Sequence, residues 1–538
     1  MSVTVTGITI NEYAMKFYDR TEEIAELQRI KNLSDVNHSR LTVVTGRRRI
    51  GKTSLIRQAF MRQTTIYLFV SRDNESILVK RFSDEIRRVL DIFIPDEVSS
   101  FRNLFTILME VAKKQRFNLV IDEFQDFYYV NSAIFSHIQD VWDRYRQETN
   151  VNFVVCGSAY RMMNKIFEDR KEPLFGRRDA LIKLNPFRTD TIKEIIKDYK
   201  PDYSNEDLLA LYTYTGGVPK YIELFMDNLV TDKDSMISYM IRDNSLFVSE
   251  GKNILIEEFG KDYGTYFSIL GCISTGINTQ ANIEGALGGI SIGGFLKRLV
   301  EDYSLIAKIR PYGASEGGKN IKYEISDNFL RFWFKYIHKN RSIVEMGNWK
   351  LLKKIISDDY TTYTGDILER YFRQKMIESM EYRYIGNWWN PKNTENQCEI
   401  DIIAVSADNT RVDIFEVKRN PERYKEGVLK EKVDHLLTDQ AEVDELIAKG
   451  FKQYGRDPYL GGLLFQDTRG DGYSLGPDGK IDGNDAYNLL SENGTPRINY
   501  GFGGSFSWKG ITIDMHFQGV GSYDRLVGCD ATKGIPQY

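Results

Sequence analysis

The chain has 538 residues, of which 42% are hydrophobic and 28% are charged, and its formal net charge is −4. A chain this long exceeds one hydrophobic core, so several domains are expected, and the slightly negative charge excludes a uniformly basic surface that coats nucleic acid. The four cysteines form no CxxC pair, which argues against a disulfide framework and a zinc site. We expect a cytoplasmic protein without membrane contact, because the sequence shows neither a signal peptide nor an apolar run of about 18 residues.

From about residue 20 to residue 240, apolar runs rich in β-formers alternate with amphipathic helical runs. Four of the apolar runs are typical of buried strands: residues 41–44, 65–70, 117–121 and 151–156. Short apolar strands separated by helices indicate a parallel, doubly wound sheet. We therefore predict an α/β fold with a core domain over residues 14–200 and a helical lid over residues 201–255.

The segment between the first strand and its helix has the pattern Gly-x-x-x-x-Gly-Lys-Thr. Its glycines let backbone N–H groups face phosphate oxygens, and the helix N-terminus adds partial positive charge. This pattern predicts a P-loop that binds ATP, with Lys52 on the β- and γ-phosphates and Thr53 on Mg²⁺. The predicted nucleotide-binding residues of the loop are Gly46, Arg47, Arg48, Arg49, Ile50, Gly51, Lys52, Thr53 and Ser54. Three consecutive arginines are unusual here and could serve as surface or partner contacts.

The third predicted strand ends with Asp122 and Glu123, as a Walker B strand does. We expect Asp122 to hold Mg²⁺, through water, and Glu123 to polarise the attacking water. Ser158 ends the next strand and could read the γ-phosphate, the alternative being an ordinary serine between strand and loop. Arg177 and Arg178 could supply an arginine finger in cis or from a neighbouring subunit of a homo-oligomer. The alternative is a solvated arginine pair.

Three short helical patterns and two β-rich runs follow, at residues 305–309 and 322–325, and favour a winged helix over residues 256–328. Residues 291–303 would form its recognition helix, with Lys297 and Arg298 exposed. Such a helix can enter the major groove of double-stranded DNA, although a winged helix can instead act as an internal switch. An aromatic-rich helical connector is expected at residues 329–358.

Residues 359–437 are predicted to form a small α/β module of a helix, a hairpin and a further helix. Glu369 lies on its helix and Asp401 on its first strand, while Glu416 and Lys418 lie on the returning strand. This arrangement resembles PD-(D/E)xK nucleases. The resemblance implies that Asp401 and Glu416 bind Mg²⁺ and that Lys418 orients or activates water and stabilises charge at the scissile phosphate. The alternatives are a structural hairpin with surface charges and a decayed nuclease.

Residues 438–538 are richer in glycine than the rest of the chain. Within them, residues 498–508 and 511–518 alternate in hydrophobicity, and the region resembles a C-terminal fragment of SusC/RagA-type TonB-dependent receptors. We interpret this tail as a product of gene fusion or assembly that does not fold independently and does not carry the function. The Asp/Gly run at residues 478–485 lacks a twelve-residue loop with a terminal Glu, so turns are favoured over a Ca²⁺ site.

Taken together, several motifs over about residues 14–437 resemble the archaeal-type ATPases of the STAND-like AAA+ group. The motifs lie at residues 17–23, 46–49, 121–125, 176–187, 216–221 and 327–333. The resemblance implies ATP hydrolysis, a region at residues 216–221 near the nucleotide, and a nuclease-like C-terminal domain. We expect an ATPase that couples its nucleotide state to a Mg²⁺-dependent DNA nuclease or DNA-binding module. The alternative is an ATP-switched regulatory module without nuclease activity.

Overall fold

The structure is a computed structural model, and its chain divides into two compact units. The described residues are 15–259, 263–314, 318, 320–389, 399–408, 411–425, 427–429 and 448, together with short strands after residue 450. The first unit comprises residues up to Tyr203, Ala210–Lys308 and Tyr323–Ile356. The second comprises Ser204–Leu209, Ile309–Lys322 and the chain from Ser357 onward.

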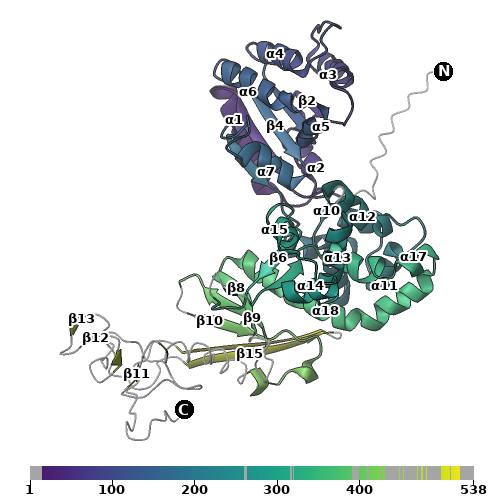
Figure 1. The fold of residues 1–538 in the computed structure, drawn as a ribbon, viewed down its shortest axis with the longest axis vertical. Helices are drawn as coiled ribbons and strands as arrows, with labels where there is room; N and C mark the ends of the chain where they lie inside the picture. Colours follow the sequence, from purple (N-terminus) through teal and green to yellow (C-terminus); the bar gives the residue numbers. More distant parts are fainter. Residues whose placement is uncertain are drawn as a thin grey trace. The chain divides into compact units, whose positions relative to one another are not determined.

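A five-stranded parallel sheet with strand order β2-β3-β4-β1-β5 organises the N-terminal part of the first unit (Figure 1). Its strands are β1 (Arg40–Thr45), β2 (Thr65–Phe69), β3 (Phe117–Asp122), β4 (Val151–Gly157) and β5 (Ala180–Lys183). Every residue of β3 and β4 is buried, as expected for parallel strands covered on both faces. The predicted α/β fold and its four apolar strands are confirmed.

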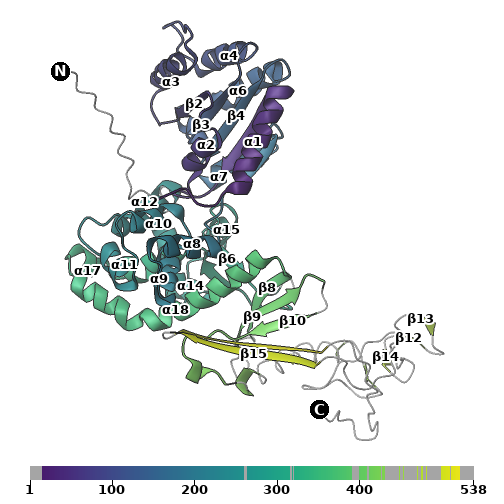
Figure 2. The same cartoon turned by 180° about the vertical axis from the view of Figure 1, so that it is seen from behind.

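Helices cover both faces of this sheet (Figures 1 and 2). They are α1 (Thr21–Val36), α2 (Lys52–Ala59), α3 (Glu75–Leu90), α4 (Phe101–Val111), α5 (Phe127–Asn131), α6 (Ala133–Tyr145) and α7 (Tyr160–Glu168), with the 3₁₀ turn η1 (Phe124–Asp126). Side chains alternate across each strand, so Leu119 and Ile121 join a core with α3, α4 and α6. Val120 between them joins the opposite core with α1 and α2.

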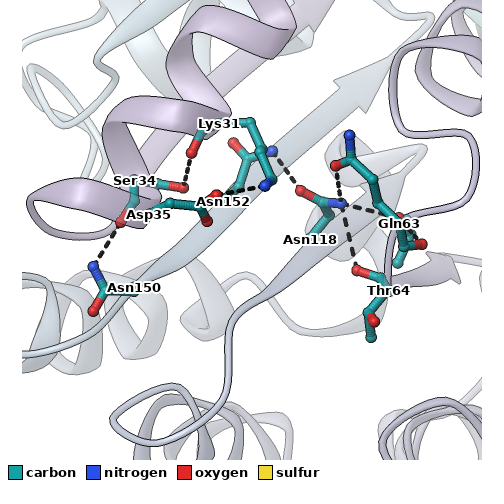
Figure 3. Close-up of polar contacts among 9 residues, drawn as sticks. Lys31, Ser34, Asp35, Gln63, Thr64, Asn118, Asn150 and Asn152 are labelled. Carbon is teal, nitrogen blue, oxygen red and sulfur yellow. Dashed lines mark hydrogen bonds and ion pairs between the residues drawn. The ribbon is translucent and has the colours of Figure 1, made fainter.

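Buried asparagines connect the strands near their amino ends (Figure 3). The Asn152 side-chain amide on β4 donates to the Asn118 carbonyl oxygen on β3 at 2.9 Å. Asn118 in turn donates to Gln63 at 3.2 Å and to the Thr65 hydroxyl at 3.1 Å. Because buried polar groups are costly unless hydrogen-bonded, this network fixes β2, β3 and β4 in register. The opposite, carboxyl ends of the strands are thereby aligned with one another.

The rest of the first unit is mostly helical. It contains α8 (Thr189–Tyr199), α10 (Pro219–Met226), α11 (Lys233–Met240), α12 (Leu246–Phe259), α13 (Tyr263–Ser274), α14 (Gln280–Ala286), α15 (Gly293–Glu301), α16 (Asn328–Phe332), the π-helix η3 (Trp333–His338) and α17 (Arg341–Glu345), while α9 (Asn205–Thr215) crosses from the second unit into the first. The two-stranded sheet of β6 (Ile306–Ile309) and β7 (Lys322–Ile325) follows α13, α14 and α15. This is the predicted order of three helices and a ribbon.

The helix predicted at residues 291–303 forms as α15, but one of its two expected exposed cations is placed differently. Lys297 is exposed, with 70% of its side chain accessible. Arg298 is only partly exposed, because its guanidinium lies 4.9 Å from the centre of the Phe295 ring and 5.6 Å from that of Tyr266. Cation–π attraction and packing of its aliphatic stem explain why this arginine lies along the helix surface.

The second unit contains a long helix and a small antiparallel sheet. Helix α18 (Trp349–Ser379) begins in the first unit and runs without a break through the predicted boundary at residue 358. The sheet has the order β10-β9-β8, with β8 (Tyr382–Trp389), β9 (Glu399–Ser406) and β10 (Val412–Phe415), and the 3₁₀ turn η4 (Pro421–Arg423) follows. The predicted hairpin is confirmed, although its returning strand ends at Phe415, so Glu416 and Lys418 follow the strand instead of lying on it.

After residue 450 the structure describes only short strands. They are β11 (Lys452–Gln453), β12 (Arg469–Gly470), β13 (Ser474–Leu475), β14 (Lys480–Ile481), β15 (Asn499–Trp508) and β16 (Ile511–Val520), of which the last two pair in antiparallel fashion. Strands β15 and β16 coincide with the two segments of alternating hydrophobicity at residues 498–508 and 511–518. Most of the Asp/Gly run at residues 478–485 lies outside the described residues. Among the helices that are described, none is long and apolar enough to cross a membrane.

Candidate functional sites

The loop between β1 and α2 has the backbone conformation that its glycines permit. Gly51 has φ of 88° and directly precedes α2, a left-handed conformation that favours glycine. At Gly46 a Cβ atom would lie 2.9 Å from Cγ2 of Ile50 and 3.0 Å from the Leu184 carbonyl oxygen. The loop therefore curls tightly against Leu184, directly after β5. It presents its backbone at the N-terminus of α2, where anions are stabilised.

Lys52 is buried in this loop and bonds to the loop's own backbone. Its ammonium donates to the carbonyl oxygens of Gly46 at 2.9 Å and Arg47 at 3.1 Å. Burial lowers the pKa of Lys52, and the nearby Glu123 and Asp122 oppose that shift only in part. A buried ammonium bonded to neutral carbonyls lacks a directly bonded anion, so an incoming phosphate would be strongly favoured beside it.

Asp122 at the end of β3 accepts hydrogen bonds from several neighbours. Its Oδ2 accepts from the Thr53 hydroxyl at 3.1 Å and from the Tyr67 hydroxyl. Its Oδ1 accepts from the Cys156 thiol and the Glu123 backbone N–H, both at 2.9 Å. Burial raises the pKa of the Tyr67 phenol and of the Cys156 thiol, so both groups remain protonated donors. The carboxylate is therefore oriented by four donors, and Thr53 lies beside it as predicted.

Glu123 adopts a strained backbone and is oriented by polar side chains. Its φ is 51°, a conformation that is uncommon outside glycine and clusters at functional sites. Its Oε2 accepts from the Gln125 amide at 2.6 Å, from the Ser158 hydroxyl at 2.7 Å and from the Ser158 backbone N–H at 3.3 Å. Ser158 is therefore a partner of Glu123 in this structure.

A cleft of about 430 Å³ collects most of the predicted nucleotide-binding residues. Those that line it are Arg48, Arg49, Ile50, Gly51, Lys52, Thr53, Ser54, Asp122, Glu123 and Ser158. Tyr18, Phe187 and Pro219 also line it and provide apolar surface. Pro219 belongs to the segment at residues 216–221, so the expected proximity of that segment to the loop is observed.

Two of the loop arginines pair with acids on the helical part of the first unit. Arg47 forms an ion pair with Asp327 at 2.7 Å, and Asp327 also caps α16 through the Leu330 N–H at 2.7 Å. The guanidinium of Arg49 contacts Glu250 of α12, with one N–O distance of 2.8 Å. Both acids are buried. These arginines therefore connect the loop to α12 and α16, a role that the sequence pattern did not indicate.

The two arginines predicted as a finger bond to acids of their own chain. Arg177 forms a bidentate contact with Asp143 of α6, with distances of 2.7–3.1 Å. Arg178 pairs with Glu168 at the end of α7 at 2.9 Å. Neither is among the residues that line the cleft. In this arrangement they are ion-paired, and a finger in cis would require both the loop and these pairs to rearrange.

The second unit brings together the four residues predicted from the PD-(D/E)xK pattern. Lys418 donates to Oδ2 of Asp401 at 3.1 Å and lies 2.6 Å from Oε1 of Glu416. The backbone N–H of Val417 also donates to Asp401 Oδ2, at 2.8 Å. Glu369 on α18 interacts electrostatically with Asp401 and Lys418. We call Glu369, Asp401, Glu416 and Lys418 the carboxylate–lysine cluster.

The electrostatics of the cluster follow from three carboxyl groups sharing one buried region. Burial raises the pKa of Glu369 well above its usual range, and the charge of Asp401 raises it further. Burial and then the charge of Glu416 raise the pKa of Asp401. Burial alone would lower the pKa of Lys418, but Asp401 and Glu416 outweigh it, and the net shift is upward. The lysine is therefore a cation, and the cluster has an excess of acidic groups over basic ones.

The cluster offers carboxylate oxygens as donors for a metal ion. Across the described residues, no group of three or more His, Cys, Asp or Glu side chains is placed to hold a metal ion. Asp401 and Glu416 nevertheless both contact the same ammonium. Two carboxylates around a cation-sized position fit Mg²⁺, which binds through one or two carboxylates plus substrate phosphates and water.

Several residues of both sites lie outside the predicted set. Tyr67 and Gln125 orient the acids of the nucleotide site, and Arg373 donates to the Asp401 carbonyl oxygen at 3.2 Å. A tyrosine inside the apolar run of β2 was the available signal for the first of them. The other two are ordinary polar residues until the chain folds.

Comparisons with known proteins match two parts of the chain to protein families. Residues 17–225 match an ATPase domain found predominantly in Archaea. Residues 333–429 match a family of archaeal and bacterial proteins of unknown function. The first match includes the whole nucleotide site and supports an ATPase function for that region. The second includes the whole carboxylate–lysine cluster.

Similar proteins include one relative by sequence and two solved structures. An uncharacterized protein of Methanocaldococcus jannaschii is 28% identical over 419 residues, which cover 75% of this chain and 87% of that protein. A Walker-type ATPase of Pyrococcus abyssi is 20% identical, with a TM-score of 0.47, over 59% of this chain and 96% of that one. The ORC2 protein of Aeropyrum pernix, in ADPNP and ADP complexes, is 12% identical, with a TM-score of 0.42, over 63% of this chain and 96% of that one.

Proposed function

We propose that this protein hydrolyses ATP in its first unit and that its nucleotide state controls a Mg²⁺-dependent DNA nuclease in its second unit. The observation that carries the proposal is the presence of both the nucleotide cleft and the carboxylate–lysine cluster in one chain. The two sets of residues belong to separate motifs and lie in separate units of the chain.

In the nucleotide site, Lys52 exchanges its two backbone carbonyl partners for the β- and γ-phosphate oxygens of ATP. The exchange is favourable because a charged acceptor forms a stronger hydrogen bond with an ammonium than a neutral carbonyl does. Glu123 then orients and polarises the attacking water. Ser158 and Gln125 support this role because they hold the Glu123 carboxylate in position.

The donors at this site fit Mg²⁺. The Thr53 hydroxyl lies 3.1 Å from Asp122, and hydroxyl and carboxylate oxygens are the ligands that Mg²⁺ prefers. When bound, Mg²⁺ neutralises charge on the phosphate oxygens of ATP. Tyr67 and Cys156 orient the carboxylate from behind.

In the carboxylate–lysine cluster, Asp401 and Glu416 would hold Mg²⁺, which supplies charge stabilisation at a scissile phosphate. Lys418 remains protonated because its pKa is raised. As a cation, Lys418 stabilises negative charge on the phosphate. The raised pKa of Glu369 favours its protonated form, and a positioned carboxyl group of this kind is suited to exchange a proton with water.

The test is plasmid cleavage by the full chain in Mg²⁺, with and without ATP. The informative variants are Lys418→Ala and Lys52→Ala, with the exposed lysines Lys375 and Lys80 changed to alanine as matched controls. We expect Lys418→Ala to abolish cleavage and leave ATP turnover intact. We expect Lys52→Ala to retain Mg²⁺-dependent cleavage but to lose its response to ATP.

Two results would contradict the proposal in different ways. Cleavage that survives Lys418→Ala would place the nuclease activity elsewhere or in a contaminant. ATP turnover without any cleavage by the wild type would favour a regulatory module that binds DNA or a partner. DNA binding by such a module would weaken steeply with salt.

A further inference from the structure

A second cavity lies beside the nucleotide cleft in the first unit. It has a volume of about 270 Å³ and shares Arg48 and Ser158 with the cleft. Four cationic side chains and two adjacent tyrosines dominate its lining: Arg48, Arg72, Tyr128, Tyr129, Arg161 and Lys165. Asp126 is the acid among the lining residues. The cavity is therefore basic and aromatic, unlike the weakly acidic chain as a whole.

The two tyrosines present accessible rings next to the cations. Tyr128 is 42% and Tyr129 is 55% exposed. The Arg72 guanidinium lies 4.3 Å from the centre of the Tyr129 ring, and the Lys165 ammonium lies 4.8 Å from that of Tyr128. A cation beside an aromatic ring with exposed surface is the arrangement that binds a base by stacking and its phosphate by charge.

The cations have acidic partners, but these contacts are exposed. Arg72 contacts Asp126 at 3.3 Å, Arg161 contacts Asp302 at 3.2 Å and Lys165 contacts Glu172 at 3.4 Å. The side chains of the three cations are 45–51% exposed. Exposed ion pairs of this kind contribute little to stability, so a phosphate can compete for these cations.

The size of the cavity selects among anionic ligands. Its volume lies just below the range of about 300–1,000 Å³ that is usual for small-molecule pockets, which suits one nucleotide and excludes a duplex. An acidic peptide would satisfy the cations but would leave the adjacent ring faces unused. The chemistry of the lining therefore favours an aromatic base that carries a phosphate.

We propose that this cavity binds one nucleotide of a single-stranded nucleic acid, with the base stacked on Tyr129 and the flanking phosphates beside Arg72, Arg161 and Lys165. The inference goes beyond the proposed function and does not require the second unit to cleave DNA. Gln125 and Ser158 line the cavity and bond to Glu123. A bound strand is thereby in contact with the residues that orient the carboxylate assigned to ATP hydrolysis.

The test measures binding of a fluorescent oligothymidylate of about 12 residues, a length within the site sizes of single-strand-binding domains. Anisotropy is recorded with the full chain at low salt in EDTA, so cleavage cannot interfere. The variants are Tyr129→Ala and Tyr129→Phe, with Tyr263→Ala as control because Tyr263 is 48% exposed and lies on α13.

We expect Tyr129→Ala to raise the Kd about tenfold, since stacking on one aromatic ring contributes on that order. Tyr129→Phe and Tyr263→Ala should stay within about twofold of the wild type, because both keep the stacking ring. Arg161→Gln should reduce the slope of log Kd against log salt concentration by about one, because one fewer counterion is released on binding. Equal binding by Tyr129→Ala and the wild type, or equal losses in Tyr129→Ala and Tyr263→Ala, would overturn the assignment. If thymidine monophosphate competes as tightly as the oligonucleotide, the ligand of the cavity is a free nucleotide and the proposal of a bound single strand is wrong.

Discussion

The two candidate sites each combine acids with one lysine, but they arrange them in opposite ways. In the nucleotide site, Lys52 bonds to backbone carbonyls while Asp122 is held by neutral donors. In the carboxylate–lysine cluster, Lys418 bonds directly to Asp401 and Glu416. The pKa of Lys52 is lowered and that of Lys418 is raised. Lys52 is therefore placed to receive an anion. Lys418 instead occupies the position between two carboxylates, where a metal cation would compete with its ammonium group.

The largest expected effect concerns Glu123, the acid proposed to polarise the attacking water. Glu123→Gln should lower ATP turnover by about 100-fold or more, because the loss of a general base costs on that order. Nucleotide binding should remain, since Lys52 and Thr53 are unchanged. Phosphate release and binding of a fluorescent ATP analogue measure the two quantities. Glu85→Gln on α3 is the control, and a parallel loss of binding would show that Glu123 supports the loop instead.

The arginine contacts of the P-loop offer a stability test of the first site. Arg49→Ala leaves the buried Glu250 without its guanidinium partner. We expect it to lower the free energy of unfolding by about 1–3 kcal/mol, as for other buried polar groups that lose a partner. Urea denaturation measures the change. The exposed pair Arg29–Glu26 provides the control, since Arg29→Ala should cost less than about 1 kcal/mol. Equal costs would mean that Glu250 is well solvated.

Tyr67 tests whether the donors around Asp122 prepare it for metal. Tyr67→Phe removes one hydroxyl donor and keeps the ring. We expect a roughly tenfold higher Mg²⁺ concentration for half-maximal ATP turnover, the usual cost of losing a partner that orients a metal ligand. Titration of Mg²⁺ at saturating ATP measures it, with Tyr145→Phe as control. An unchanged Mg²⁺ requirement would restrict Tyr67 to packing.

The smallest expected effect is a pH dependence in the carboxylate–lysine cluster. The folded state raises the pKa of Glu369, so its contribution to stability is present below the ordinary carboxyl range and is lost as pH rises through the raised pKa. Glu369→Gln should therefore raise the Tm by a few degrees near pH 8 and change it little near pH 4. Thermal unfolding at both pH values, with Glu378→Gln as control, checks the sign. A stabilisation that does not vary with pH would exclude titration as its cause.

The sequence predicts a site well when the residues of that site lie close together along the chain, and poorly when they come from distant segments. Lys52 and Thr53 begin α2 directly after the glycine loop, so the local spacing was enough to predict them as phosphate and Mg²⁺ ligands. Asp122 was predictable because a parallel strand ends beside that loop. Tyr67 on β2 and Cys156 on β4 reach Asp122 only because those strands flank β3 in the order β2-β3-β4. Strand order is a long-range property that local patterns do not contain.

For this protein, the sequence by itself determined the α/β core, the P-loop, the acid pair at the end of β3 and the four members of the carboxylate–lysine cluster. Glycine spacing, apolar periodicity and short motifs act within a few residues, which is why these features could be read directly. Only the tertiary structure decided that Arg47 and Arg49 bind Asp327 and Glu250, and that Arg177 and Arg178 bind acids of their own chain. An arginine's partner is chosen by which carboxylate is near and by how deeply it is buried. Both quantities exist only once distant segments have packed together.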